Sequence, residues 1–141
     1  MTETPPRIVL DTNVLYAGLY SASGKSYELL QLIAEGRVRI ALSTPLLFEY
    51  EDVLKRNQAV LSLSDAEVDV VLDNLCALAD FQAIYFLWRP CLPDANDDMI
   101  LELAVAAQVP RIVSFNAKDF RPATSFGIEL VTPKIMLEEL Q

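Results

Sequence analysis

The strongest evidence for the fold is the segment Arg7-Ile8-Val9-Leu10-Asp11-Thr12-Asn13-Val14-Leu15. Its first four residues form a short, β-branched apolar run, which is typical of a strand buried inside a parallel sheet. The run stops at Asp11, and the residues from Asn13 onward predict a short helix that ends between Gly18 and Ser23. Asp11 is therefore expected just after the carboxyl end of a buried strand, where open parallel sheets bind their ligands.

The rest of the sequence alternates strands with helices. Apolar runs predict further strands at 38–42, 84–87, 111–114 and 128–131. Helical spacing of apolar residues predicts helices at 26–35, 45–54, 65–78, 99–107 and 133–140. This alternation predicts an α/β fold, a three-layer α/β/α sandwich with a mainly parallel central sheet, in a single domain over residues 1–141.

Local signals indicate where the helices begin and where the chain turns. Thr44 is the expected N-cap of its helix, with Pro45 in the first helical position. Ser64 and Glu67 have the spacing of a capping box. Residues 57–64 are expected to form an exposed turn, and residues 93–98 an acidic turn before a helix that begins at Met99.

The charged residues narrow the chemistry that is open to the chain. It has 20 acidic and 11 basic residues, a net charge of −9, and no His. The lack of His excludes a histidine general base and zinc sites that contain histidine. A chain that binds nucleic acid mainly by neutralising phosphates should be basic. The acids are therefore expected either to gather at a metal site or to meet a basic partner.

The sequence contains nothing that resembles a membrane span or a targeting signal. No stretch approaches the roughly 18 apolar residues that a spanning helix needs. Cys76 and Cys91 are expected to be reduced thiols. A cytoplasmic protein without membrane association is the expectation.

Four separate segments place acidic or amide side chains where strands end or where the next helix begins. They are Asp11-Thr12-Asn13, Glu49, Asp94-Ala95-Asn96-Asp97-Asp98 and Asn116-Ala117-Lys118-Asp119. Carboxylates at close quarters repel one another and are costly to desolvate, unless a divalent cation lies between them. Mg²⁺ and Mn²⁺ prefer such oxygen ligands. The pattern predicts a site for one or two of these ions, whose chemistry needs no histidine.

Each segment also has an explanation that involves no ligand. Asp11 can cap the helix that follows it, and Glu49 can belong to a solvated charge run with its neighbours Glu51 and Asp52. Acids near a helix N-terminus are favoured by the helix dipole, and Asn and Asp stabilise turns. The arrival of all four segments at one sheet edge favours a shared site over four unrelated explanations.

These segments resemble the PIN-domain family, and most closely the PIN-type toxins of bacterial toxin–antitoxin systems, over nearly the whole chain. The motifs are Ile8-Val9-Leu10-Asp11-Thr12-Asn13-Val14-Leu15, Ser43-Thr44-Pro45-Leu46-Leu47-Phe48-Glu49-Tyr50, Asp94-Ala95-Asn96-Asp97-Asp98-Met99-Ile100-Leu101-Glu102-Leu103-Ala104 and Ile112-Val113-Ser114-Phe115-Asn116-Ala117-Lys118-Asp119-Phe120. The resemblance implies an endoribonuclease that uses Mg²⁺ or Mn²⁺ to cleave RNA, leaving a 3′-hydroxyl and a 5′-phosphate. It also implies an antitoxin partner, seated on an apolar groove of exposed leucines from helices 26–35 and 46–54, and is compatible with a homodimer.

The resemblance further implies roles for individual residues. The residues around the metal are Asp11, Glu49, Asp97, Asn116 and Asp119. Asn116 is neutral where many relatives have Asp, so Asp119 is expected to supply the missing charge. The residues that would orient Asp11 and water, or assist from outside the ligand set, are Asn13, Ser114 and Asp94. The residues that would hold flanking phosphates are Lys25, Lys118 and Arg121.

Two other readings of the sequence stay open. The neutral Asn116 and the acidic balance are also compatible with a PIN-like scaffold that has lost catalysis and serves as a binding module. An Asp after the first strand also occurs in response-regulator receivers and haloacid-dehalogenase-like hydrolases. The dehalogenase pattern needs a second Asp where this chain has Asn13, and a receiver needs an acidic pair where the first strand offers one acid.

Overall fold

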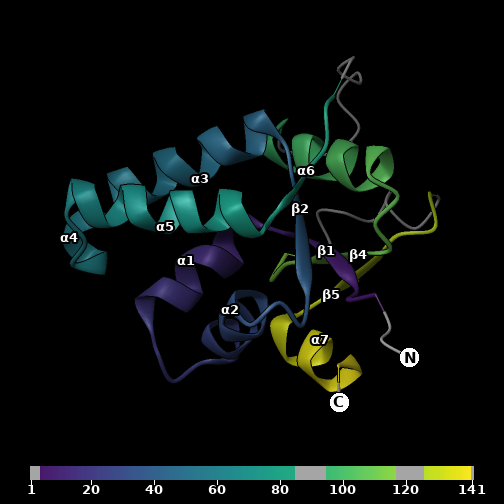
Figure 1. The fold of residues 1–141 in the computed structure, drawn as a ribbon, viewed down its shortest axis with the longest axis horizontal. Coiled ribbons are helices and arrows are strands. Elements are labelled where there is room, and N and C mark those ends of the chain that lie inside the picture. The colour runs from purple at the N-terminus through teal and green to yellow at the C-terminus, as the bar shows by residue number, and fades with distance from the viewer. Residues whose placement is uncertain (1–3, 85–94, 117–125, 141) are drawn as a thin grey trace.

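A computed structural model describes residues 4–84, 95–116 and 126–140, with 95–98 described as helical backbone only. Figure 1 shows the arrangement of its elements. The strands are β1 (Arg7–Leu10), β2 (Arg39–Leu42), β3 (Asp80–Phe81), β4 (Arg111–Val113) and β5 (Glu129–Val131). The helices are α1 (Thr12–Tyr20), α2 (Lys25–Ala34), α3 (Thr44–Arg56), α4 (Gln58–Leu61), α5 (Asp65–Leu78), α6 (Ala95–Ala106) and α7 (Pro133–Glu139).

The strands form one parallel sheet in the order β3-β2-β1-β4-β5. β1 lies at its centre, with Ile8 beside Ile40 of β2 and beside Arg111 of β4. Because all strands run in the same direction, their carboxyl ends meet at one edge, which we call the carboxyl edge. The residues that follow β1, β2 and β4 therefore come together there, as the sequence predicted.

Helices cover both faces of the sheet, which gives the predicted three-layer α/β/α architecture. In Figure 1, α3, α5 and α6 lie above the strands, and α2 and α7 lie below them. α6 contacts β1, β2 and β4, and α3 packs against α1, α5 and α6. On the other side α2 packs against α1 and α7. Within the described residues, no helix is long and apolar enough to cross a membrane.

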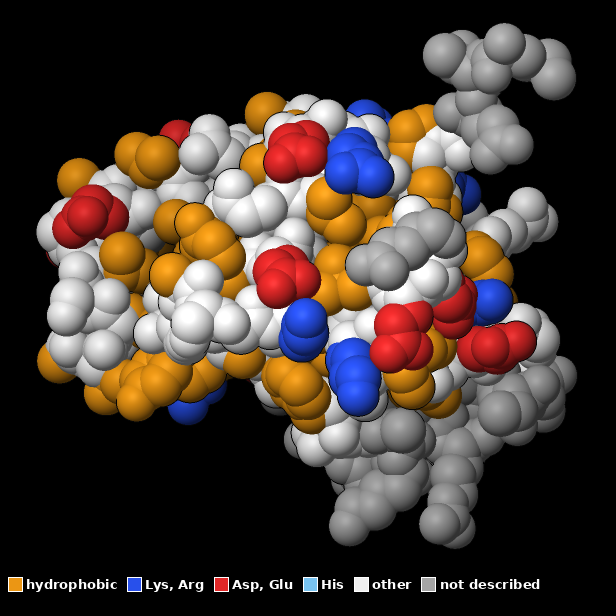
Figure 2. Space-filling view, turned by 90° about the horizontal axis from the view of Figure 1, so that it is seen from below, with side chains coloured by type: hydrophobic (Ala, Val, Ile, Leu, Met, Phe, Trp, Pro, Cys, Tyr) orange, Lys and Arg blue, Asp and Glu red, His pale blue; other side chains and the backbone are white. Residues whose placement is uncertain are grey.

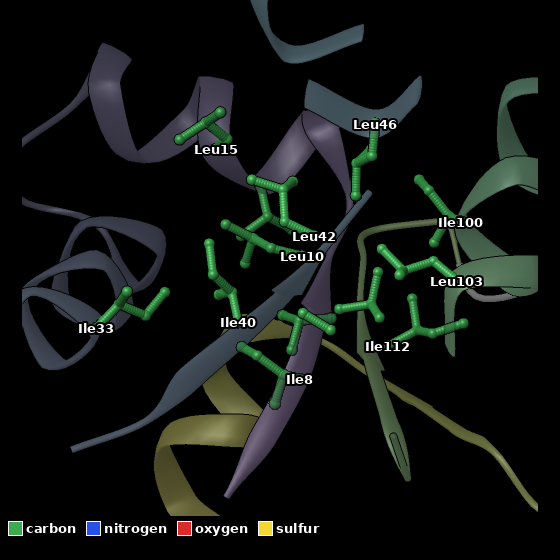
Figure 3. Packing of buried hydrophobic residues seen from close by; sticks show 14 of the residues in the cluster. Ile8, Leu10, Leu15, Ile33, Ile40, Leu42, Leu46, Ile100, Leu103 and Ile112 are labelled. Carbon is green, nitrogen blue, oxygen red and sulfur yellow. The ribbon is translucent and has the colours of Figure 1, made fainter. Parts of the chain in front are cut away.

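The core lies between these layers and is built from aliphatic side chains of the central strands. Figure 3 shows Ile8 and Leu10 of β1 beside Ile40 and Leu42 of β2 and Ile112 of β4. All five side chains are fully buried. Helices contribute the remaining layer, with Leu15, Ile33, Leu46, Ile100 and Leu103 directed toward the strands (Figure 3). Burial on both faces explains why the central strands β1 and β2 are mainly apolar runs.

The structure corrects three predicted boundaries. Residues 57–64 do not form an exposed turn, because they contain α4, whose Leu61 is buried in the core. The N-cap of α3 is Ser43 and not Thr44, since the Ser43 hydroxyl accepts a hydrogen bond from the Leu46 N–H at 3.3 Å. α6 begins at Ala95 and not at Met99, so Asp97 and Asp98 lie in the first helical turn.

The third strand was also predicted in the wrong place. It lies at Asp80–Phe81, and Ile84 is not part of a strand, while 85–87 lie outside the described residues. Asp80 accepts hydrogen bonds from the Arg39 guanidinium of β2, the shortest at 2.7 Å. This bond to Arg39 holds the pKa of the Asp80 carboxyl below its usual value. An ion pair between neighbouring strands thus fixes where β3 pairs.

Candidate active site at the carboxyl edge

Asp11 lies at the carboxyl edge, directly after β1, and is 6% exposed. Its backbone N–H donates to the carbonyl of Val113 at 2.9 Å, which continues the pairing of β1 with β4 by one residue. Asp11 is the N-cap residue of α1 by position, but its side chain makes no capping hydrogen bond. A helix cap therefore does not account for this buried carboxylate.

Ser114, the residue after β4, holds the Asp11 side chain. The Ser114 hydroxyl donates to Asp11 Oδ2 at 2.6 Å, and Ser114 is itself fully buried. The same hydroxyl oxygen accepts the backbone N–H of Asn116 at 3.0 Å. Because that oxygen accepts from one side, its own proton is directed toward the carboxylate. The Asn116 N–H therefore donates to the Ser114 hydroxyl, which in turn donates to the Asp11 carboxylate. These two hydrogen bonds fix the orientation of Asp11.

Tyr50 of α3 anchors that helix to the end of β1. It is fully buried, and its hydroxyl donates to the carbonyl of Leu10, the residue before Asp11. Burial, and secondarily the negative charge of Asp11, raise the pKa of the Tyr50 hydroxyl well above its ordinary value of 10.0. Tyr50 therefore stays neutral and feels the charge of Asp11, so the second turn of α3 lies at the site.

Glu49 differs from the acids that follow it on α3. Glu51, which is half-buried, and the exposed Asp52 pair with bases one turn later, Lys55 at 3.5 Å and Arg56 at 2.9 Å. Glu49 is half-buried and lies three residues after the fully buried Leu46, on the flank of the helix face that packs inward. The ion pairs within α3 therefore involve Glu51 and Asp52, while Glu49 lies beside the helix face that packs inward.

Two further oxygens at the start of α1 lack a partner in the structure. They are Thr12 Oγ1 and Asn13 Oδ1, both buried. Buried polar atoms are nearly always hydrogen-bonded, and the exceptions often mark places where a water or an ion binds. A carboxylate, an amide oxygen and a hydroxyl are the oxygen donors that hard divalent cations accept. The residues present at this edge thus fit such an ion.

The described carboxylates do not complete a metal site by themselves. Within the described residues, no three Asp, Glu, Cys or His side chains gather closely enough to hold an ion. The Asp97 side chain, Asp94, Lys118, Asp119 and Arg121 lie outside the described residues. Asn116 is exposed beside Ser114, and it reaches the site through its backbone N–H. The structure thus brings Asp11, Ser114 and Asn116 together, and the full ligand set stays a prediction.

Two predicted binding features look different in the structure. Lys25 is exposed at the start of α2, where its ammonium lies 3.6 Å from the carboxylate of Glu28. In the predicted leucine groove on 26–35 and 46–54, Leu29, Leu46 and Leu54 are fully buried in the core, whereas Leu30, Leu32 and Leu47 are half-buried. On α3, the large apolar side chain that is exposed is Phe48.

Sequence reasoning missed two polar residues near the core. Tyr50 has helical spacing with Leu46, which signals a buried face, but spacing does not reveal where a buried hydroxyl finds its acceptor. Glu102 of α6 is 6% exposed between Leu101 and Leu103. The sequence contained a sign of this: Glu102 is a charged residue among the apolar residues of its helix. Buried charges need polar partners, so such a residue indicates a polar contact in the core.

Comparison with known proteins agrees with this geometry. A family model described as a PIN domain matches residues 7–118, which span β1 through the segment after Ser114. No curated protein matches the chain. PIN domains are typically nucleases, and they generally use divalent metal ions. A parallel three-layer sandwich with a buried Asp after its first strand, matched over most of its length, identifies this chain as a member of the PIN-domain family.

Proposed function

We propose that this PIN domain is an endoribonuclease that depends on Mg²⁺ or Mn²⁺. The observation that carries the proposal is the buried Asp11 carboxylate, held by Ser114 at 2.6 Å on the carboxyl edge. A structural cap would not need this arrangement, since the Asp11 side chain makes no capping bond to α1. Aligning a buried carboxylate is what an oxygen-based ion site requires.

The residues at the carboxyl edge have different roles in the proposed reaction. Asp11 and Glu49 would hold the cation, together with Asp97 and either Asn116 or Asp119 as the sequence predicts. A bound divalent cation supplies Lewis-acid stabilisation of a phosphoryl oxygen and an activated water. Ser114 keeps Asp11 in one orientation, and Tyr50 holds α3 against the end of β1. The expected products are RNA fragments with a 3′-hydroxyl and a 5′-phosphate.

Cleavage of labelled single-stranded RNA tests this function. The wild-type chain should cut in Mn²⁺ or Mg²⁺ and stop when EDTA is added. Asp11→Asn should lower the rate by at least about a hundredfold, the lower range for loss of a positioned catalytic group. Asp52→Asn is the matched control, because it also removes one carboxylate but from the solvated face of α3. Equal cleavage by Asp11→Asn and Asp52→Asn would contradict the proposal.

As part of this proposal the chain acts in the cytoplasm as the toxin of a toxin–antitoxin pair. A depression of about 310 Å³ between α3 and α5, which includes Leu47 of the predicted leucine groove, is the surface for the antitoxin. Leu47, Phe48, Leu72 and Cys76 provide its apolar lining, and Glu51, Asp69 and Asp73 its acidic lining. A helix with apolar and basic side chains complements such a surface.

Co-expression with the product of a neighbouring small reading frame tests the partner. The wild-type chain should co-purify with it and lose RNA cleavage. Phe48→Ser should weaken the complex and leave cleavage by the free chain intact, since Phe48 is 61% exposed and contributes little to the core. A complex equally tight with Phe48→Ser would show that the partner binds elsewhere.

The second candidate function is a binding module without catalytic activity, because Asn116 adds no charge to the site. Restoring a carboxylate with Asn116→Asp distinguishes the two. An active nuclease should keep or raise its rate in Mn²⁺, because Asn116 is exposed and its backbone bond to Ser114 is unaffected. A chain that cleaves only as Asn116→Asp would support the binding module for the natural sequence.

A further inference from the structure

One side of α1 is only partly buried and begins at the carboxyl edge. Thr12, Val14, Leu15 and Gly18 are the buried residues of this helix. Asn13, Tyr16, Ala17 and Tyr20 lie on the other side, and we call them the α1 stripe; the first three are half-buried, Tyr16 partly against the core, and Tyr20 is exposed. With 3.6 residues per turn, positions three, four and seven after Asn13 share its face. The α1 stripe thus leads from the site outward over the surface.

Two aromatic rings stack on this stripe. The rings of Tyr16 and Tyr20 have centroids 6.0 Å apart and planes inclined by 17°. Tyr20 is nevertheless 62% exposed. A ring that has one face against a neighbour and is still mostly exposed must present its other face to solvent. The pair therefore forms a stack with an open end.

Close packing on the opposite side holds α1 in place. Gly18 faces α2, where an added Cβ would lie 2.4 Å from Leu30 Cδ1 and 3.2 Å from the Ser26 carbonyl carbon. The absence of a side chain at Gly18 thus lets the two helices approach each other closely. This contact fixes the rotation of α1 about its own axis, and therefore the direction in which the tyrosine pair faces.

Within the described residues, few basic side chains are available to RNA without a carboxylate close by. Of the eight Lys and Arg side chains in the described residues, all except Lys134 lie within 4.0 Å of a carboxylate oxygen. Figure 2 shows basic and acidic side chains side by side on the face that it displays. Base stacking on aromatic rings needs no charge and tolerates any base sequence. An acidic protein can therefore use it where phosphate contacts are scarce.

We propose that Tyr16 and Tyr20 form a base-stacking subsite for single-stranded RNA. The subsite rests on the proposed function, because it takes the strand that leaves the cleavage site. From Asn13 to Tyr20 the helix rises about 10 Å, at 1.5 Å per residue. That length matches about three stacked nucleotides at 3.4 Å each. The base that stacks on Tyr20 is thus two or three nucleotides from the scissile phosphate.

Fluorescence anisotropy of a labelled 12-nucleotide single-stranded RNA tests the subsite, with Asp11→Asn present in every protein to prevent cleavage. Tyr20→Leu should weaken binding at least about fivefold, the lower range for loss of one stacked base. Tyr20→Phe should bind like the parent, because the ring is retained. Phe126→Leu is the matched control, since Phe126 is also exposed (47%) but precedes β5 at the opposite edge of the sheet.

An oligonucleotide with one abasic nucleotide, moved along the strand, shows whether the ring stacks on a base. The parent should lose affinity when the abasic position meets Tyr20, and Tyr20→Leu should show no further loss there. A purely structural role for Tyr20 would leave the two losses additive and overturn the subsite. Tyr20→Leu binding as tightly as the parent, or a parent that binds no RNA, would also overturn it.

These outcomes separate the subsite from the proposed function. A wild-type chain that cleaves RNA while Tyr20→Leu binds normally refutes only the subsite. A chain that binds RNA through Tyr20 and does not cleave it refutes only the nuclease. In an active enzyme, Tyr20→Leu should raise KM for the 12-nucleotide RNA with little change in kcat, because the ring lies far from the reacting atoms.

Discussion

Ser114 shows how a neutral residue can control a charged one. Its hydroxyl lies between the Asn116 amide and the Asp11 carboxylate, all three held by the pairing of β1 with β4. The serine adds no charge and is not itself among the predicted ligands. Its effect on the site is to keep a buried carboxylate in a single orientation, and this role predicts the effect of its removal.

Ser114→Ala should lower both stability and metal affinity. A buried carboxylate that loses its donor costs about 1–3 kcal/mol, which urea unfolding measures. Affinity for Mn²⁺ should fall about 10–100-fold, as for other partners that orient a metal ligand. Thr132→Ala is a suitable control, because it removes the hydroxyl that caps α7 and lowers stability by about 1 kcal/mol without touching Asp11. Unchanged Mn²⁺ affinity in Ser114→Ala would contradict this role.

The buried hydroxyl of Tyr50 predicts a loss of stability at alkaline pH. Its pKa is raised in the folded chain, so above about pH 10 the unfolded chain releases this proton while the folded chain keeps it. The contribution of Tyr50 is thus complete below pH 10 and falls by about 1.4 kcal/mol per pH unit above it. Urea unfolding of the wild type and Tyr50→Phe between pH 8 and about pH 11 measures the effect.

The difference in stability between the two proteins should shrink only above pH 10. Below that, Tyr50→Phe should be less stable by about 1–3 kcal/mol, because the Leu10 carbonyl loses its buried donor. A difference that stays constant through pH 11 would show that Tyr50 titrates alike in both states. At the residue scale, the sequence could place Asp11 at a strand end, but not the acceptor of Tyr50, 40 residues away in the chain.

At the scale of elements, the end of α6 carries a local strain. Gln108 has φ of 55°, a left-handed conformation that favours glycine. Its N–H donates to the Val105 carbonyl, and the Val109 N–H donates to the Ala104 carbonyl, which closes the helix. A residue with a side chain thus occupies the position that glycine usually takes after a helix.

Gln108→Gly should therefore stabilise the protein by up to about 1 kcal/mol, since it relieves the left-handed strain. The control is Ala106→Gly in the last turn of the same helix, which should destabilise by up to about 1 kcal/mol because glycine is a poor helix residue. Thermal unfolding of both variants measures the two opposite shifts. A lower melting temperature for Gln108→Gly would show that its side chain makes a compensating contact.

Most elements could be predicted because local signals agreed with the fold. The strand runs, the Ser64–Glu67 capping box and the parallel arrangement are confirmed. The errors arose where distant contacts decide. Leu61 makes residues 58–61 a helix because the core accepts its side chain. Arg39 of β2 pairs with Asp80 of β3, a contact between strands that apolar runs do not predict.

At the scale of the whole molecule, the net charge of −9 governs how RNA can approach. The predicted phosphate-binding residues are three, Lys25, Lys118 and Arg121. Each phosphate contact with a single strand contributes about −0.7 to the slope of log affinity against log salt concentration. Three contacts therefore limit the slope to about −2. A basic RNA-binding protein with many contacts would show a much steeper dependence.

Anisotropy titrations of Asp11→Asn with single-stranded RNA at 50–300 mM KCl should thus give a slope no steeper than about −2. Tyr20→Leu should shift the whole line to weaker binding without changing its slope, because stacking releases no counterions. Lys118→Ala should instead make the slope of log affinity against log salt concentration shallower by about 0.7, the contribution of one phosphate contact. A slope of about −4 or steeper would mean that phosphate contacts beyond these three dominate binding.

The hydrogen bond between Asp11 and Ser114 also determines when the site can form during synthesis of the chain. The two residues are 103 positions apart, so a ribosome that adds about 5–20 residues per second needs about 5–20 s to reach the serine after the aspartate. Until then a nascent chain has β2 on one side of β1 but lacks both β4 on the other side and the hydroxyl that aligns Asp11. For a nuclease of the proposed kind, this order of synthesis prevents assembly of the site until the segment that follows β4 has been made.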